Sequence, residues 1–375
     1  MARKLFIPGP THVRPEILAA QAAPIISHRG PEMKQLLADC LPGVRSAFGT
    51  SGDAVILSCS STAAMEAVSR SVTRPGRRVL HLTNGNFSHL WFELSVACGL
   101  SARRAEKPWG DGWDEASTAE ELAWHRDLDA VMVTHCETST GALSDIAGVT
   151  RAVRAAMPEA LVCVDVTSTA CGVAIDFDAI DIDVAVGGVQ KCWALPPALA
   201  LGALSPRARA RMAAVPARGY TNDFLSALSF QDEQGLTSTT PSIPLMVALR
   251  QQIGDIMAAG GFAARRDRHL AMQALVLDWA AQRGFGVLAR EGFRSPSVTS
   301  LESKGRFVMD ELVAGYAKEG FFLTGGYGRT KDSHWRIGHM GDHTPQDIEE
   351  LLAATDRILT ALKAHDPKRH AAAPR

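Results

Sequence analysis

The chain has 375 residues, a formal net charge of −1, 46% hydrophobic and 21% charged residues, a composition typical of a globular protein with a full hydrophobic core. The near-neutral charge argues against nucleic acid and acidic membrane surfaces as partners, and no apolar stretch is long enough to span a bilayer. The length predicts one large domain with a smaller one.

The N-terminus and the cysteines indicate a cytoplasmic protein. Residues 1–6 run directly into Pro-Gly-Pro at 8–10, which leaves no room for the apolar region of a signal peptide. The seven cysteines form no CxxC pair, and Cys98, Cys163 and Cys171 lie in apolar sequence. We therefore expect free thiols in a reducing compartment, without a disulfide framework or a metal site.

Strands and helices alternate over the first 204 residues. Residues 1–15 should form an extended arm, because their three prolines forbid a helix. We predict helices at 31–48, 63–68 and 87–98, and strands at 55–57, 78–82, 130–134, 161–164, 182–186 and 199–204. This alternation predicts an α/β fold with a mostly parallel sheet covered on both faces, which places ligands at the carboxyl ends of the strands.

A hydroxyl-rich turn follows the strand at 55–57. Residues 58–62 read Ser-Cys-Ser-Ser-Thr, and a strong helix former follows at 63–68. Backbone N–H groups point outward at a helix N-terminus, and the helix dipole favours negative charge there. The turn therefore predicts an anion site that suits a phosphate group.

The pattern changes near residue 250 and predicts a second, smaller α+β domain. A long helical pattern with basic pairs runs from residue 243 to 272 and beyond. It is followed by a strand at 298–301, a helix near 307–318, apolar segments at 321–324 and 335–338, and a last helix that Thr344 caps and Pro345 begins. We therefore expect a large domain at 1–250, a small C-terminal domain at 251–365 and a disordered tail at 366–375.

The stretch Gly-Gly-Val-Gln-Lys-Cys-Trp at 187–193 carries the strongest indication of chemistry. It follows the strand at 182–186, and the strand at 161–164 leads into Asp165. Pyridoxal phosphate (PLP) chemistry uses such a pair: a lysine forms a Schiff base with the cofactor aldehyde, and a carboxylate keeps the pyridine nitrogen protonated. Partial desolvation would lower the pKa of Lys191 and ready its amine for this reaction. Lys191 and Asp165 are therefore the candidate catalytic pair.

Each candidate also has a structural interpretation. Lys191 could be an exposed loop lysine, as most lysines are, and Asp165 could cap a helix. Thr138 could bond the phenolic oxygen of the cofactor or simply belong to a hydroxyl-rich turn. Phe87, from the sequence alone, best suits a core position. Arg336, flanked by two apolar residues, could be a surface strand residue, but the arginine fork is suited to a carboxylate.

Several short motifs occur in a specific order along the chain. They are Pro-Gly-Pro-Thr at 8–11, Ser-His-Arg at 27–29, Thr-His-Cys-Glu-Thr-Ser-Thr-Gly at 134–141, Val-Asp at 164–165, Gln-Lys at 190–191, Pro-Pro at 196–197 and Arg-Ile-Gly-His-Met-Gly at 336–341. No single motif is decisive. As an ordered set covering nearly the whole chain, they resemble the class V (fold type I) PLP-dependent aminotransferases, above all the alanine/serine–glyoxylate aminotransferase group and its phosphoserine aminotransferase-like relatives.

The resemblance implies a role for each matching residue. Lys191 would be the Schiff-base lysine and would move the proton between the substrate Cα and the cofactor C4′, and Asp165 would pair with the pyridine nitrogen. The other implied cofactor contacts are Thr138 (ring oxygen), Phe87 (ring stacking), Ser60, Ser61, Thr62 and Gln190 (phosphate), and Thr240, which would reach the phosphate of the other subunit. The implied substrate contacts are Arg336, which would clamp the α-carboxylate, with Gly9 and Thr169 near it, and His28 and Arg29. A homodimer with shared active sites is therefore expected.

Three positions depart from the family pattern. Cys59-Ser60-Ser61 stands where the family commonly has Gly-Ser-Gly, Phe87 where some members have tryptophan, and Thr237 where some have tyrosine. Glycines allow the backbone to approach a phosphate closely. The departures therefore concern the phosphate site and the affinity for PLP.

The expected reaction is a ping-pong transamination between serine or alanine and glyoxylate or pyruvate, since one arginine clamp suits small substrates. The alternative is phosphoserine with 2-oxoglutarate, because His28-Arg29 could reach the substrate phosphate of the neighbouring subunit. A cysteine desulfurase or other PLP lyase is less favoured, because no cysteine follows Cys192. A cofactor-free binding protein is also less favoured, because Lys191 and Asp165 are both intact.

Overall fold

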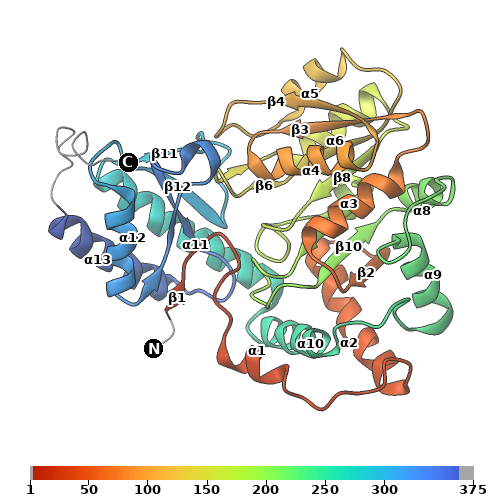
Figure 1. Ribbon diagram of the computed structural model, residues 1–375, viewed down its shortest axis with the longest axis horizontal. Coiled ribbons are helices and arrows are strands. Elements are labelled where there is room, and N and C mark those ends of the chain that lie inside the picture. Colours follow the sequence, from red (N-terminus) through yellow and green to blue (C-terminus); the bar gives the residue numbers. More distant parts are fainter. Residues whose placement is uncertain (1–2, 363–375) are drawn as a thin grey trace.

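A seven-stranded sheet forms the centre of the larger part of the molecule in the computed structural model, which describes residues 3–362 (Figure 1). In sheet order its strands are β2 (Asp53–Leu57), β10 (Ala200–Leu204), β9 (Val184–Gly188), β8 (Leu161–Asp165), β5 (Leu128–Thr134), β3 (Arg78–Thr83) and β4 (Ser101–Glu106). Strand β10 is antiparallel to both of its neighbours, and the remaining adjacent pairs are parallel. The predicted mostly parallel sheet is confirmed.

Both faces of this sheet are buried under helices. Successive strand residues point to opposite faces, so Leu80 and Val131 belong to one hydrophobic cluster and their neighbours Val79 and Ala130 to the other. The first cluster includes residues of α1 (Pro15–Ala20), α2 (Pro31–Phe48), α5 (Glu115–Leu122), α6 (Ile146–Ala156), α7 (Phe177–Ile180) and α10 (Ile243–Ala258). The second includes residues of α3 (Ser61–Val72), α4 (Asn86–Ala97), α8 (Pro206–Ala213) and α9 (Phe224–Gln234).

A smaller antiparallel sheet with its own hydrophobic cluster lies beside the large one (Figure 1). Its strands, in order, are β11 (Gly286–Val287), β12 (Val298–Glu302), β15 (His334–Gly338) and β14 (Thr324–Gly325). Trp335 packs in this cluster with residues of α12 (Met309–Lys318), α13 (Pro345–Ala361) and the second half of α11 (Gly261–Gln282). Thr344 caps α13 and Pro345 is its first residue, as predicted.

The long helical pattern predicted from residue 243 forms two helices. Helix α10 ends at Ala258 and α11 begins at Gly261, because Gly260 (φ +99°) and Gly261 (φ +79°) adopt the left-handed conformation. The start of α11 packs on the large-sheet cluster through Phe262, and its later turns pack on the small-sheet cluster through Val276. A domain boundary at residue 250 stays a prediction.

The N-terminal arm joins the small sheet to the end of β9. Strand β1 (Lys4–Leu5) pairs in parallel with β13 (Phe321–Phe322), and the Gly338 N–H donates to the Phe6 carbonyl at 2.7 Å. The Thr11 N–H donates to the Gln190 carbonyl at 2.9 Å. The arm therefore passes directly beside Lys191.

Two further short elements complete the fold, a hairpin of β6 (Cys136–Glu137) and β7 (Ala142–Leu143) and the 3₁₀ helix η1 (Gly328–Thr330). The predicted tail at 366–375 lies outside the described residues. Across residues 3–362, none of the helices combines the length and apolar character that crossing a membrane requires.

Candidate active site

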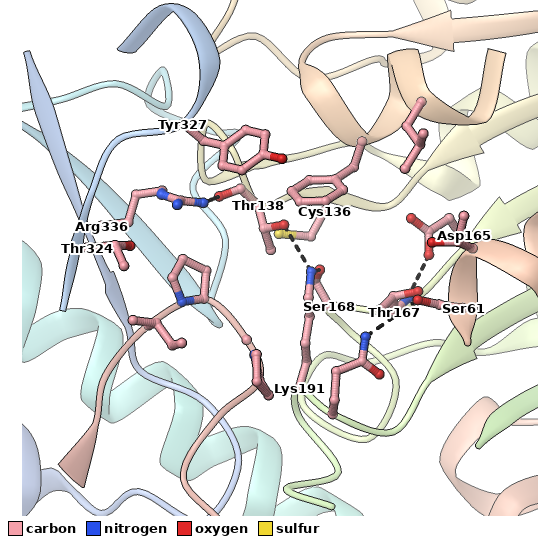
Figure 2. Close-up of a pocket in the computed structure, with 18 of the residues that line it drawn as sticks. Ser61, Cys136, Thr138, Asp165, Thr167, Ser168, Lys191, Thr324, Tyr327 and Arg336 are labelled. Carbon is pink, nitrogen blue, oxygen red and sulfur yellow. Dashed lines mark hydrogen bonds between the residues drawn. The ribbon is translucent and has the colours of Figure 1, made fainter. Parts of the chain in front are cut away.

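A cavity of about 430 Å³ lies at the carboxyl ends of β8 and β9, where a doubly covered parallel sheet is expected to bind ligands (Figure 2). It is bounded by the sheet on one side and by the N-terminal arm and the small sheet on the other. Nine of the residues predicted for the site line it: Gly9, Ser61, Thr62, Phe87, Thr138, Asp165, Gln190, Lys191 and Arg336.

Lys191 follows β9 and extends into the cavity with only 8% of its surface exposed. Its Nζ donates hydrogen bonds to Thr138 Oγ1 at 3.0 Å and to Ser168 Oγ at 2.9 Å (Figure 2). Burial lowers the pKa of Lys191, and the negative charge of Asp165 only opposes this effect. This lowering favours the neutral amine, which is the form that acts as a nucleophile.

Gly9 of the arm packs directly on the lysine side chain. A Cβ atom at this position would lie 2.7 Å from Lys191 Cγ, and the backbone of Gly9 has a φ of +117°. Glycine is therefore required both for the conformation and for the close approach. Through this contact the arm fixes the stem of the lysine.

Asp165 ends β8 on the opposite side of the cavity from Arg336 (Figure 2). Its Oδ1 accepts from the backbone N–H of Thr167 at 2.9 Å. Burial raises the pKa of Asp165, and the hydrogen bonds from Thr167 lower it in part. A buried carboxylate of this kind is stabilised in its charged form by a cationic N–H placed against it.

The turn predicted to bind an anion forms the N-terminus of α3, beside the cavity. The Ser60 side chain caps the helix by accepting from the Ala63 N–H at 3.1 Å. Ser61 and Thr62 in the first turn line the cavity, where backbone N–H groups have no acceptor within the helix. Gln190 Nε2 donates to Ser61 Oγ at 3.4 Å and so closes this end of the cavity.

Glu137 is a buried carboxylate to which the sequence assigned no role. It organises the turn that carries Thr138. It accepts from the backbone N–H groups of Phe87 (3.0 Å) and Ser88 (2.9 Å) at the start of α4, and from the Ser139 hydroxyl at 2.6 Å. Negative charge is stabilising at a helix N-terminus. Glu137 thereby fixes Phe87 and Thr138, which both line the cavity.

Arg336 in β15 points into the cavity from the small sheet (Figure 2). Its Nη1 donates to the Thr138 carbonyl at 3.2 Å and its Nε to the Gly325 carbonyl at 3.4 Å. It is only 6% exposed, and burial lowers its pKa to about 10. Within residues 3–362 it forms no ion pair with a carboxylate, so the guanidinium is suited to receive one from a ligand.

The remaining predicted residues do not line this cavity. Thr169 is fully buried and its hydroxyl donates to the Val166 carbonyl at 3.3 Å. Arg29 is exposed and donates to the Thr237 carbonyl at 2.8 Å. Ser60, His28 and Thr240 are likewise absent from the lining. If His28, Arg29 and Thr240 contribute to an active site, that site must therefore belong to another subunit.

Ser168 and Tyr327 are two of the cavity residues that the sequence did not identify as site residues. The Ser168 hydroxyl accepts a hydrogen bond from Lys191, whereas the neighbouring Thr169, which was the predicted site residue, does not line the cavity. The only signal was a run of three hydroxyl residues after Asp165, which does not show which one faces the lysine. Tyr327 lines the cavity from the loop after β14, and its sequence context gave no signal.

These residues fit PLP on three counts. A buried amine can condense with the cofactor aldehyde, a buried carboxylate can hold the ring nitrogen, and the first turn of α3 can receive the phosphate. Across the described residues, no group of three or more histidine, cysteine, aspartate or glutamate side chains is placed to hold a metal ion. The fold and the site together define a PLP-dependent enzyme.

Comparison with known sequences identifies the family. The sequence model named Aminotransferase class-V matches residues 16–311, and the chain belongs to that family of PLP-dependent aminotransferases. The chain is 30% identical over 371 residues to L-aspartate–glyoxylate aminotransferase of Paracoccus denitrificans, covering 96% of this chain and 91% of the relative. It is 28% identical over 367 residues to serine–glyoxylate aminotransferase of Methylorubrum extorquens, covering 95% and 90%.

A solved structure supports the same assignment. The subgroup IV aspartate aminotransferase of Thermus thermophilus superposes with a TM-score of 0.88 at 28% identity, covering 96% of this chain and 99% of that one. The protein is thus an enzyme that transfers an amino group between an amino acid and a 2-oxo acid.

Proposed function

We propose that the enzyme transaminates a small amino acid with a single carboxylate, serine or alanine, using glyoxylate or pyruvate as acceptor. The observation that carries this proposal is the charge of the cavity. Among residues 3–362, the only charged residues that line the cavity are Asp165, Lys191 and Arg336. Lys191 and Asp165 would hold PLP, which leaves Arg336 as the cation for one substrate carboxylate. The names of the two glyoxylate aminotransferase relatives support glyoxylate as an acceptor.

PLP, when bound, supplies an aldehyde that carries the amino group and a ring that stabilises the electron pair left on the substrate Cα. The chain's residues do the rest. Arg336 holds the substrate carboxylate and so orients the Cα–H bond. The Lys191 amine would take the substrate Cα proton and deliver it to the cofactor carbon C4′, while the hydroxyls of Thr138 and Ser168 hold the amine in place between the two transfers. Burial lowers the pKa of Lys191, which favours the amine with a free lone pair that acts as the base.

The substrate pair can be tested on the purified enzyme loaded with PLP. We expect serine or alanine to change the visible absorbance of the bound cofactor and glyoxylate or pyruvate to restore it. The kcat/KM for these donors should exceed that for aspartate and for phosphoserine by about 10²-fold or more, since a second anionic group has no partner in the cavity. A preference for phosphoserine with 2-oxoglutarate would favour the alternative function. Failure to develop cofactor absorbance after addition of PLP would contradict the role of Lys191.

Cavity chemistry also disfavours a cysteine-based PLP reaction. Cys136 lines the cavity, but burial raises its pKa to about 11, so its thiol stays protonated near neutral pH. All seven cysteines are free thiols, which supports the proposed location in the reducing cytoplasm.

We further propose a homodimer in which Thr240 of one subunit completes the phosphate site of the other. Thr240 is exposed and lies outside the cavity of its own chain, and Arg29 anchors the same segment through the Thr237 carbonyl. We expect a sedimentation mass near twice the 40.1 kDa of one chain. Two inactive variants, Lys191→Ala and Thr240→Asp, should regain activity when refolded together, because one mixed site is then intact. Dimers that regain no activity would contradict the sharing of Thr240.

A further inference from the structure

Tyr327 contacts both Arg336 and Phe87 at one wall of the cavity. It lies in the loop that follows β14, is 47% exposed and lines the cavity. Its ring stacks on Phe87, with 5.6 Å between ring centroids and 27° between planes. The Arg336 Cζ lies 5.4 Å from the centre of the same ring (Figure 2). Tyr327 therefore contacts both the residue expected to face the cofactor and the residue expected to hold the substrate.

Contacts on either side of Tyr327 hold its loop against the large sheet. The Arg329 guanidinium lies 4.3 Å from the centre of the Trp109 ring and pairs with Glu106 at 3.2 Å. A Cβ on Gly328 would lie 2.5 Å from the Asn86 side chain, so the loop backbone rests directly on the start of α4. These contacts span the two sheets and keep the Tyr327 ring in place without a ligand.

We propose that Tyr327 is a specificity-determining residue that limits donors to those with a small side chain. The proposal rests on the proposed function. A donor held by Arg336 and reacting next to Lys191 has its side chain at the wall that Tyr327 forms with Phe87. A branched side chain would displace the tyrosine ring and break its contacts with both neighbours, whereas the methyl or hydroxymethyl group of alanine or serine would not.

The test compares alanine with leucine as donor, with glyoxylate as acceptor. In Tyr327→Ala we expect the ratio of kcat/KM for leucine to that for alanine to rise by about 10-fold or more, the range that pocket size gives in discriminating aliphatic side chains. The change should appear as a lower KM for leucine. The dissociation constant of leucine, measured from the absorbance change without acceptor, should fall in parallel.

Matched variants separate this role from a structural one. Tyr327→Phe keeps the ring and should keep the wild-type ratio, whereas Tyr327→Val provides a second small side chain. Lys331→Ala changes an exposed residue of the same loop outside the cavity and should leave activity unchanged. An unchanged ratio in folded Tyr327→Ala or Tyr327→Val would overturn this inference alone. A wild-type enzyme that transaminates neither donor would overturn the proposed function and this inference with it.

Discussion

Replacement of Lys191 by alanine is expected to abolish transamination, lowering kcat by about 10⁴-fold or more, because in the proposed function the same amine binds PLP and transfers the substrate proton. The two hydroxyl groups that accept from Nζ, those of Thr138 and Ser168, cannot take over the role because neither is basic. The measurement is the rate at which alanine or serine changes the cofactor absorbance in a single half-reaction.

Two controls make the lysine experiment specific. Lys318→Ala removes an exposed lysine from the last turn of α12 and should leave the rate unchanged. Small primary amines added to Lys191→Ala should partly restore the rate, because a methylamine-sized base can occupy the volume of the deleted side chain. A Lys191→Ala enzyme that retains more than a tenth of wild-type kcat would place the proton transfer on another residue.

The central strands could be predicted from sequence because they are buried on both faces and therefore read as apolar runs. β5 and β8 illustrate this, since every residue of both strands is buried. The edge strand β4 was missed for the complementary reason. It reads Ser-Ala-Arg-Arg-Ala-Glu, with a single buried residue, and such a pattern does not distinguish an edge strand from a loop.

The site residues that could be predicted are those that lie at or just past the end of a buried strand. Asp165 ends the apolar strand β8 and Lys191 follows the apolar strand β9, so their meeting at one sheet edge follows from the fold class. Tyr327 was not predictable, because its contacts with Phe87 and Arg336 join three distant segments. Such contacts depend on how the small sheet docks beside the large one, which local patterns do not encode.

Arg336 combines deep burial with the absence of an acidic partner in the described part of the chain, a combination that is unfavourable for stability. A buried charge loses hydration, and the two carbonyl groups that accept from Arg336 compensate only in part. The lowering of its pKa to about 10 by burial expresses the same cost. In the proposed function, the counter-charge for this guanidinium is the substrate carboxylate.

Replacing Arg336 by methionine should therefore separate function from stability. We expect kcat/KM for the donor to fall by about 10²- to 10³-fold, as when one partner of a buried, hydrogen-bonded charge pair is lost. The free energy of unfolding should change by no more than about 1 kcal/mol, because an apolar side chain of similar length replaces an unpaired buried charge. Arg336→Lys keeps the positive charge but lacks the two-pronged guanidinium, so its kcat/KM should lie between the values for wild type and for Arg336→Met. Arg103→Met, at an exposed position of β4, is the control expected to change neither quantity. If Arg336→Met unfolded the protein at much lower urea concentration while kcat/KM of the folded fraction stayed near wild type, Arg336 would be a structural residue and the substrate carboxylate would have to bind elsewhere.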